Sequence, residues 1–250
     1  MVLYKDTMSV FSPMVKRGAG KTYTMLGDNK SLGLIPRAVN SIYDELDETN
    51  FTLELRITEI YNEKMKDLIS NDNVKGNELE TTSVVIRSKD EIMSYINKSI
   101  KYRATESTDC NAFSSRSHSI YSLKLKVRTK GETIESMLNF IDLAGSERIK
   151  ESHVEGKRLK ETQNINKSLL SLKIVFNSII NKEKHVPYRD SKLTYLLKSS
   201  LENKSKVLML LNVSLDDKDY NETLCSLRFG QVVNAVYVGR GAKQLVKEIE

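Results

Sequence analysis

The most constraining feature of this chain is a glycine-rich stretch that ends in a lysine and a threonine, Gly18-Ala19-Gly20-Lys21-Thr22. Backbone N–H groups can wrap around an anion only where no Cβ intervenes, which is why such a turn requires glycine. A lysine in this place reaches the outer phosphates of a nucleotide, and a threonine hydroxyl at the start of the next helix ligates Mg²⁺. The stretch therefore predicts a phosphate-binding loop that is followed directly by a helix.

The first half of this loop departs from the general pattern G-x-x-x-x-G-K-[ST]. The pattern places its first glycine at position 15, where this chain has Val15. If the backbone needs a conformation there that only glycine adopts easily, valine costs about 1–3 kcal/mol. A buried parallel strand is expected ahead of the loop, but the segment from Met8 to Met14 contains Pro13 and two serines. From the residues alone, a strand there is doubtful.

Length and composition indicate one large α/β domain. The chain has 250 residues, of which 39% are hydrophobic and 29% charged, enough for one well-filled core without a disordered or fibrous bias. No apolar run approaches the roughly 20 residues that cross a bilayer, and Met1 to Phe11 lack the layout of a signal peptide. The two cysteines, Cys110 and Cys225, give neither a disulfide framework nor zinc spacing. We therefore expect an intracellular protein with no membrane partner.

The net charge of +6 favours an acidic partner, which could be nucleic acid or an acidic protein surface. Aromatic residues make up only 7% of the chain and tryptophan is absent, so a base-stacking platform for single strands has little material. The composition therefore argues against nucleic acid.

Apolar periodicity predicts strands that alternate with helices after the loop. Helices are predicted at 35–46, 90–102, 164–180, 191–201 and 220–236. Strands are predicted at 53–57, 83–87, 119–129, 137–141 and 207–213, and the first of these is expected to run through Glu59 to Glu63 into a short helix that ends near Ile69. This alternation predicts an α/β fold, with a mixed and mainly parallel central sheet and helices on both faces. Together with the glycine-rich loop, it suggests a fold of the P-loop nucleoside triphosphatase type.

Two further polar segments suit contact with a nucleotide. The apolar strand from Met137 stops at Asp142, and Gly145 follows three residues later. A carboxylate in this place holds Mg²⁺, commonly through water, and a glycine N–H can approach a γ-phosphate closely. The segment from Asn111 to His118 offers closely spaced hydroxyls and a guanidinium. Taken singly, Asp142 is equally well explained as an ordinary loop residue, and a serine-rich segment is usually only a loop.

Together these segments resemble the kinesin motor domain. Asn111 to His118 resembles the switch I motif N-x-x-S-S-R-S-H, and Asp142 to Glu147 matches the switch II motif DLAGSE. Further segments of kinesin type are EIYNE at 59–63, QNINKSL at 163–169, VPYRDSKLT at 186–194 and ETLCSLRF at 222–229. They cover the chain from about Gly18 to Val236 in the order of the family. The resemblance implies a kinesin motor fold that lacks its first strands.

The resemblance implies ATP as the substrate and Mg²⁺ as the cofactor. The nucleotide would be bound by six residues, which are Gly18, Ala19, Gly20, Lys21, Thr22 and Tyr23. Among them, Lys21 would hold the phosphates and Thr22 would hold Mg²⁺.

The two switches would complete this site. Ser114 and Ser115 would approach the γ-phosphate and the metal, Asp142 would hold Mg²⁺ through water, and Gly145 would sense the γ-phosphate. Arg116 and Glu147 would form an ion pair that closes the switches and helps to position the attacking water. The alternative for this pair is an ordinary surface contact worth about 0–1 kcal/mol.

A track-binding face is predicted on the helix around 164–180. Its apolar residues at 165, 169, 172, 176 and 179 are spaced to form one buried stripe, which leaves other sides of the helix to solvent. In kinesins this helix and the loop after it meet the microtubule, whose surface is acidic. The residues expected to bind tubulin are Lys160, Lys167, Arg189 and Lys192. The alternative is that each is only a solvated cation.

The resemblance also divides the chain and suggests a subclass. We expect an irregular N-terminal remnant at 1–17, a motor domain at 18–238 and a short tail at 239–250. The ending at 226–234 resembles kinesins whose motor is C-terminal and minus-end-directed. This subclass implies a homodimer or heterodimer formed through a coiled coil that this sequence lacks, and a location in the cytoplasm on cytoskeletal microtubules, including those of the spindle.

Two functions follow from these observations. The first is an ATP-driven microtubule motor domain that couples MgATP hydrolysis to microtubule binding. The second is a catalytically impaired kinesin-like module that binds microtubules, or the partner subunit of an active motor, because Val15 is unusual and no Arg-x-Arg-Pro motif precedes Gly18. A P-loop kinase or GTPase is a third class, but no base-recognition motif supports it.

Overall fold

The fold is described by a computed structural model, in which residues 7–12, 20–28, 30–47, 50–74, 81–105, 116–129, 131–145, 157–201, 205–214 and 216–236 are placed. Within these ranges the strands are β1 (Thr7–Ser12), β2 (Phe51–Tyr61), β3 (Lys64–Asp67), β4 (Val84–Ile86), β5 (His118–Arg128), β6 (Thr133–Asp142) and β7 (Lys206–Met209). The α-helices are α1 (Lys21–Leu26), α2 (Leu34–Glu45), α3 (Lys89–Thr105), α4 (Lys157–Ile180), α5 (Lys192–Leu201) and α6 (Tyr220–Ala235). Two short 3₁₀ helices are η3 (Tyr188–Asp190) and η4 (Asp217–Asp219).

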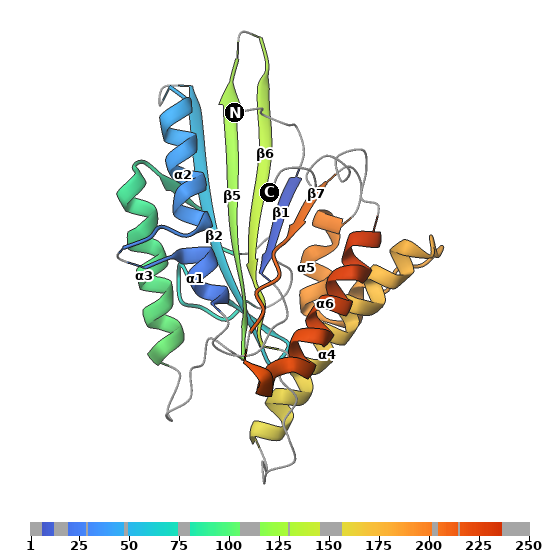
Figure 1. The fold of residues 1–250 in the computed structure, drawn as a ribbon. Coiled ribbons are helices and arrows are strands. Elements are labelled where there is room, and N and C mark those ends of the chain that lie inside the picture. The colour runs from blue at the N-terminus through green and yellow to red at the C-terminus, as the bar shows by residue number, and fades with distance from the viewer. Residues whose placement is uncertain are drawn as a thin grey trace.

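One mixed sheet separates two layers of helices. The strand order is β3-β2-β5-β6-β1-β7, and β4 also pairs with β2. Helices α1, α2 and α3 lie on one face of the sheet, and α4, α5 and α6 lie on the other (Figure 1). The predicted α/β architecture with helices on both faces is thus confirmed.

Strand direction shows why the sheet is mixed. β1 runs parallel to β6 and to β7, whereas β5 is antiparallel to both β2 and β6. It follows that β1, β2, β6 and β7 share one direction, and that β3, β4 and β5 run against it. Two of the antiparallel ladders, β2 with β3 and β5 with β6, join consecutive strands, because a hairpin needs only a short connection, whereas β2 and β5 are distant in the chain.

A regular strand precedes the predicted phosphate loop, which answers the question that the residues left open. β1 lies between β6 and β7, and Val10 and Phe11 are 4% and 0% exposed. Pro13 follows the last residue of the strand, so it removes no donor from the described ladder. The segment 1–17, predicted to be irregular, therefore contributes an inner strand of the sheet at residues 7–12.

The predicted short helix after Glu63 is wrong, because β3 turns back antiparallel along β2. The register pairs Tyr61 with Lys64, which leaves Asn62 and Glu63 as a two-residue turn. Both turn residues have positive φ angles, 50° and 57°. Two successive residues of this kind form the turn whose twist matches a β-hairpin.

The other predicted elements are present with shifted ends. The structure confirms the helices over α2, α3, α5 and α6, and the strands over β4, β5 and β6. α4 begins at Lys157, earlier than predicted, and β7 ends at Met209, earlier than predicted. No helix in the described ranges has the length and apolar character needed to cross a membrane.

Each face of the sheet has its own hydrophobic cluster. Val10 belongs to the cluster under α1, α2 and α3, and its neighbour Phe11 belongs to the cluster under α4, α5 and α6. This division follows from the alternation of side chains along a strand. The predicted stripe of α4 lies in the second cluster: Leu169, Leu172 and Phe176 are at most 2% exposed.

Candidate functional site

The start of α1 has the backbone that a phosphate-binding turn needs. Gly20 precedes the helix with φ 84° and ψ 15°, in the left-handed region that favours glycine. Its carbonyl accepts hydrogen bonds from the backbone N–H and the hydroxyl of Thr24, at 2.8 and 3.0 Å. The Asn212 amide donates to that hydroxyl at 3.0 Å, so the chain beyond β7 supports this turn. Gly18 and Ala19 lie outside the described residues.

Parallel pairing of β1 with β6 brings the predicted metal ligands together. Ser12 lies opposite Asp142 in the register, so both strands end at the place where α1 begins. The Thr22 hydroxyl donates a hydrogen bond to Asp142 Oδ2 at 2.9 Å, and the neighbouring Lys21 is only 8% exposed. Tyr23, in contrast, is 51% exposed on α1. Residues 120 positions apart thus form one polar site at the carboxyl ends of two parallel strands.

Asp142 has the properties of a cation ligand. Burial raises the pKa of its carboxyl group, and this effect is opposed by Arg103, by the hydrogen bond from Thr22 and by Lys21. Its Oδ1 atom is buried and, among the described residues, accepts no hydrogen bond. A buried carboxylate oxygen that lacks a partner is costly, and a carboxylate beside a hydroxyl is a donor set that Mg²⁺ prefers. The residues present therefore fit a Mg²⁺ ion.

Arg103, Glu59 and Ser117 form a buried cluster beside this site that the sequence did not reveal. Arg103 Nε of α3 lies 3.0 Å from Glu59 Oε1 of β2, and its Nη2 donates to Ser117 Oγ at 3.0 Å. The Ser117 hydroxyl donates in turn to Glu59 Oε1 at 2.6 Å. All three residues are at most 4% exposed. The only signal in the sequence was that Glu59 and Ser117 belong to segments of kinesin type.

Arg116 forms an ion pair with a residue that the sequence did not indicate. Its Nη1 lies 2.7 Å from Oε2 of Glu161 in α4, and the two side chains are 25% and 7% exposed. Burial, together with Glu161, raises the pKa of the nearby Tyr61 to about 12. The predicted partner, Glu147, lies outside the described residues, as do Ser114 and Ser115. The pair between the two switches therefore stays a prediction.

His118 and Gly145 belong to the described part of the two segments that are predicted to be switches. The His118 side chain is 2% exposed, and burial, with a smaller contribution from Arg103, lowers its pKa to about 3. Its Nδ1 accepts a hydrogen bond from the Ala144 N–H at 3.0 Å, and its Nε2 lies 2.8 Å from Ser168 Oγ of α4. Gly145 is buried in the segment that follows β6.

The predicted track-binding cations that the structure describes lie at the surface. Lys167 is exposed on α4, and Arg189 and Lys192 are exposed at η3 and at the start of α5. The Lys192 N–H donates to Glu63 Oε2 at 2.9 Å, which joins α5 to the turn between β2 and β3. Lys160 lies within α4, but its side chain is outside the described part.

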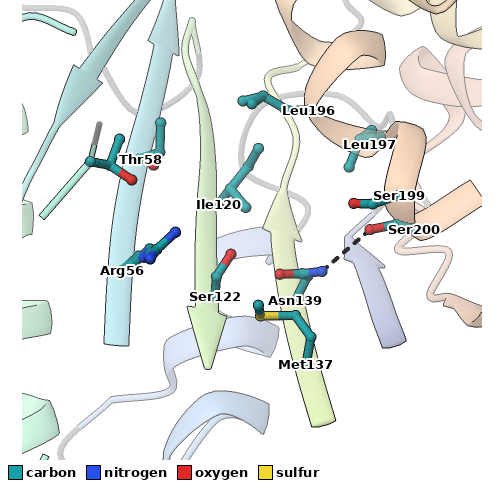
Figure 2. A pocket seen from close by; sticks show the side chains of 11 residues that line it. Arg56, Thr58, Ile120, Ser122, Met137, Asn139, Leu196, Leu197, Ser199 and Ser200 are labelled. Carbon is teal, nitrogen blue, oxygen red and sulfur yellow. Dashed lines mark hydrogen bonds between the residues drawn. The ribbon is translucent and has the colours of Figure 1, made fainter. Parts of the chain in front are cut away.

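A separate pocket of about 130 Å³ lies between the sheet and α5 and contains none of the predicted site residues. Figure 2 shows Arg56, Ser122 and Asn139 side by side on three strands, as their register requires. The Asn139 amide donates to Ser200 Oγ of α5 at 3.3 Å.

Comparison with known proteins shows which chains are similar to this one. The family model "Kinesin motor domain" matches residues 15–236. Kinesin-related protein 2 of Dictyostelium discoideum is 40% identical over an alignment that covers 92% of this chain and 33% of that protein. Carboxy-terminal kinesin 2 of Xenopus laevis is 39% identical over an alignment that covers 89% of this chain and 39% of that protein. The chain thus spans little more than a third of the length of these relatives.

Solved structures share the fold as well as the sequence. A KIF14 dimer in its two-heads-bound state, solved with AMP-PNP in complex with a microtubule, superimposes with a TM-score of 0.80 at 33% identity. The match covers 94% of this chain and 74% of that one.

Proposed function

This chain belongs to the kinesin motor domain family, and we propose that it hydrolyses MgATP and couples the hydrolysis to microtubule binding and movement. The observation that carries the proposal is the contact of Thr22 with Asp142, whose second carboxylate oxygen has no partner in the described part of the chain. Thr22 follows the lysine of the predicted phosphate loop, and Asp142 is the first residue of the DLAGSE segment, so the contact joins the two motifs. Sequence and geometry therefore point to the same nucleotide site.

Each residue of the nucleotide site has a proposed role. Lys21 would hold the outer phosphates, and Thr22 and Asp142 would hold Mg²⁺, the latter through water, with Ser115 as a further ligand. The chemistry that Mg²⁺ would supply here is neutralisation of the charge that develops on the transferred phosphoryl group. Gly145 senses the γ-phosphate because its N–H can approach an oxygen closely.

The microtubule face is proposed on α4, η3 and the start of α5. The exposed side of α4 combines Lys167 and Lys173 with Leu170 and Ile174, which are 58% and 40% exposed. Cations provide attraction to an acidic surface, and exposed apolar side chains provide area to bury. Lys160, Arg189 and Lys192 are further proposed contacts with tubulin. Binding through these cations would weaken as salt is added.

The similarity to carboxy-terminal kinesins extends the proposal to the whole protein. We propose minus-end-directed movement and a homodimer or heterodimer formed through a coiled coil outside this sequence. Its location would be on cytoplasmic microtubules, including those of the spindle.

The test is ATP turnover with and without microtubules for the wild type, Lys21→Ala and Lys30→Ala. Lys30 is an exposed lysine in the turn after α1 and serves as the matched control. We expect microtubules to stimulate turnover by the wild type and by Lys30→Ala, and we expect Lys21→Ala to lose nucleotide binding. A folded wild type that binds microtubules without any stimulation would contradict the proposal and would favour the impaired binding module instead.

A further inference from the structure

We propose that His118 is a positioning residue that couples the segment after Asp142 to helix α4. The inference rests on the proposed function, in which this segment responds to the nucleotide and α4 faces the microtubule. The observation is that one buried imidazole makes hydrogen bonds to both, through Ala144 N–H on one side and Ser168 Oγ on the other.

The hydrogen bonds define the protonation state of His118. Because the Ala144 N–H donates to Nδ1, this ring nitrogen carries no proton, and the proton of the neutral ring must lie on Nε2. Nε2 therefore donates to Ser168 Oγ at 2.8 Å, and the Ser168 hydroxyl donates onward to the Ile165 carbonyl at 2.7 Å. Each polar hydrogen in this series of hydrogen bonds has one acceptor. The donors and acceptors therefore follow one order, from the Ala144 N–H through His118 and Ser168 to the backbone of α4.

The sheet holds the backbone of His118 in place. His118 is the first residue of β5, and its backbone lies in register with Ile60 of β2. The preceding residue, Ser117, is fixed by the buried cluster with Arg103 and Glu59. Because the imidazole cannot follow a displaced partner far, movement of the segment after Asp142 must strain or break one of its two hydrogen bonds.

The far end of the link lies inside the helix that is proposed to bind the track. Ser168 is 2% exposed and precedes the buried Leu169, whereas Lys167 before it faces solvent. A change transmitted to Ser168 therefore acts on the rotation or position of α4 as a whole, since the helix is packed along its buried stripe. The competing explanation is a core hydrogen bond that adds stability without coupling the two segments.

The experiment compares Ser168→Ala with Ser171→Ala in the full chain. Ser171 is 5% exposed on the same helix, one turn further along, and is the matched control. The readout is the ratio of microtubule dissociation constants measured with MgADP and with a non-hydrolysable ATP analogue. We expect Ser168→Ala to reduce the wild-type ratio by about threefold or more, and Ser171→Ala to leave it nearly unchanged.

A second variant tests the other end of the same link. His118→Asn keeps an acceptor near the Ala144 N–H, but its shorter side chain cannot reach Ser168. We expect it to reduce the ratio as Ser168→Ala does, and we expect the double variant to show no further reduction, because both changes remove one interaction. Reductions that multiply in the double variant would contradict a shared link.

The possible results separate this inference from the proposed function. If Ser168→Ala lowers only the thermal unfolding midpoint and keeps the wild-type ratio, the contact is structural and the inference is wrong. If the wild type itself binds microtubules equally well with both nucleotides, the proposed function is wrong, and so is the inference that rests on it. Equal loss of the ratio in Ser168→Ala and Ser171→Ala would also overturn the inference, because the effect would then be one of helix packing.

Discussion

Two arginine–glutamate pairs involve Ser117 or its neighbour in the chain, Arg116, and they differ in burial and in what they join. The side chains of Arg103 and Glu59 are 5% and 1% exposed, connect α3 with β2, and share the Ser117 hydroxyl. Arg116 and Glu161 are 25% and 7% exposed and connect the start of β5 with α4.

The difference in burial gives the two pairs different roles. Removal of one partner from a buried pair leaves an uncompensated charge in a medium of low dielectric constant, so such a pair keeps its geometry. A partly hydrated arginine loses less when its partner changes, because water replaces the lost hydrogen bonds. The Arg103 pair is therefore suited to anchor the beginning of β5, and the Arg116 pair is suited to exchange partners when the nucleotide changes.

The largest effect is expected when the buried pair is broken. Glu59→Gln leaves the Arg103 guanidinium buried without its counter-charge, and we expect a loss of about 3–5 kcal/mol in the free energy of unfolding. Urea denaturation measures this loss. The control is Glu54→Gln, whose pair with Lys126 is half-exposed and should contribute about 0–1 kcal/mol. Equal losses in both variants would show that burial does not distinguish the pairs.

Acid should destabilise the folded protein through the buried imidazole of His118, which follows Ser117 of the buried cluster. The folded-state pKa of about 3 lies below the ordinary value near 6.5, so between these values the unfolded chain binds more protons. This contribution to stability is intact above pH 6.5 and falls by about 1.4 kcal/mol per pH unit below it, or about 2 kcal/mol at pH 5.

The matched measurement uses urea denaturation of the wild type and His118→Asn at pH 7 and pH 5. Since Asp142 and other groups titrate in both proteins, only the difference between the two pH dependences reports on His118. We expect the wild type to lose more stability than the variant. Parallel pH dependences would mean that the imidazole is accessible to protons in the folded state.

Breaking the Arg116 pair should cost less than breaking the buried pair. In Glu161→Gln the guanidinium stays partly hydrated, and we expect a loss of about 1 kcal/mol. Urea denaturation beside Glu59→Gln gives the comparison directly. A loss as large as that of Glu59→Gln would mark the Arg116 pair as a second anchor and would remove the reason to regard it as exchangeable.

The smallest effect is expected at the surface pair of Lys124 and Glu135, whose side chains are 32% and 53% exposed. Glu135→Gln should change the free energy of unfolding by less than about 1 kcal/mol, and about 1 M salt should abolish the difference. A salt-resistant loss would show that exposure alone does not rank these pairs.

Local patterns in the sequence predicted most elements of the fold, because apolar periodicity depends on neighbouring residues. The alternation from Leu123 to Val127 in β5 and the stripe of α4 are confirmed in this way. β1 was harder to recognise because its strand character depends on β6 and β7 on either side, which come much later in the chain. The turn at Asn62 and Glu63 was missed because neither residue is a glycine, although both adopt positive φ angles.

Contacts between distant residues limit what the sequence can reveal of the site. Thr22 and Asp142 could be predicted as neighbours, because a phosphate loop and an apolar strand ending in aspartate are each recognisable alone. The cluster of Glu59 with Arg103 and Ser117 could not, since its members are separated by 44 and 58 positions and charged residues are usually exposed. Glu161 was missed for the same reason.

The most direct test of nucleotide-coupled track binding is co-sedimentation of the wild-type chain with microtubules, in MgADP and in a non-hydrolysable ATP analogue. The proposed motor should bind with dissociation constants that differ by about fivefold or more between the two nucleotides. Equal dissociation constants in a folded preparation would contradict it and would leave only a microtubule-binding module.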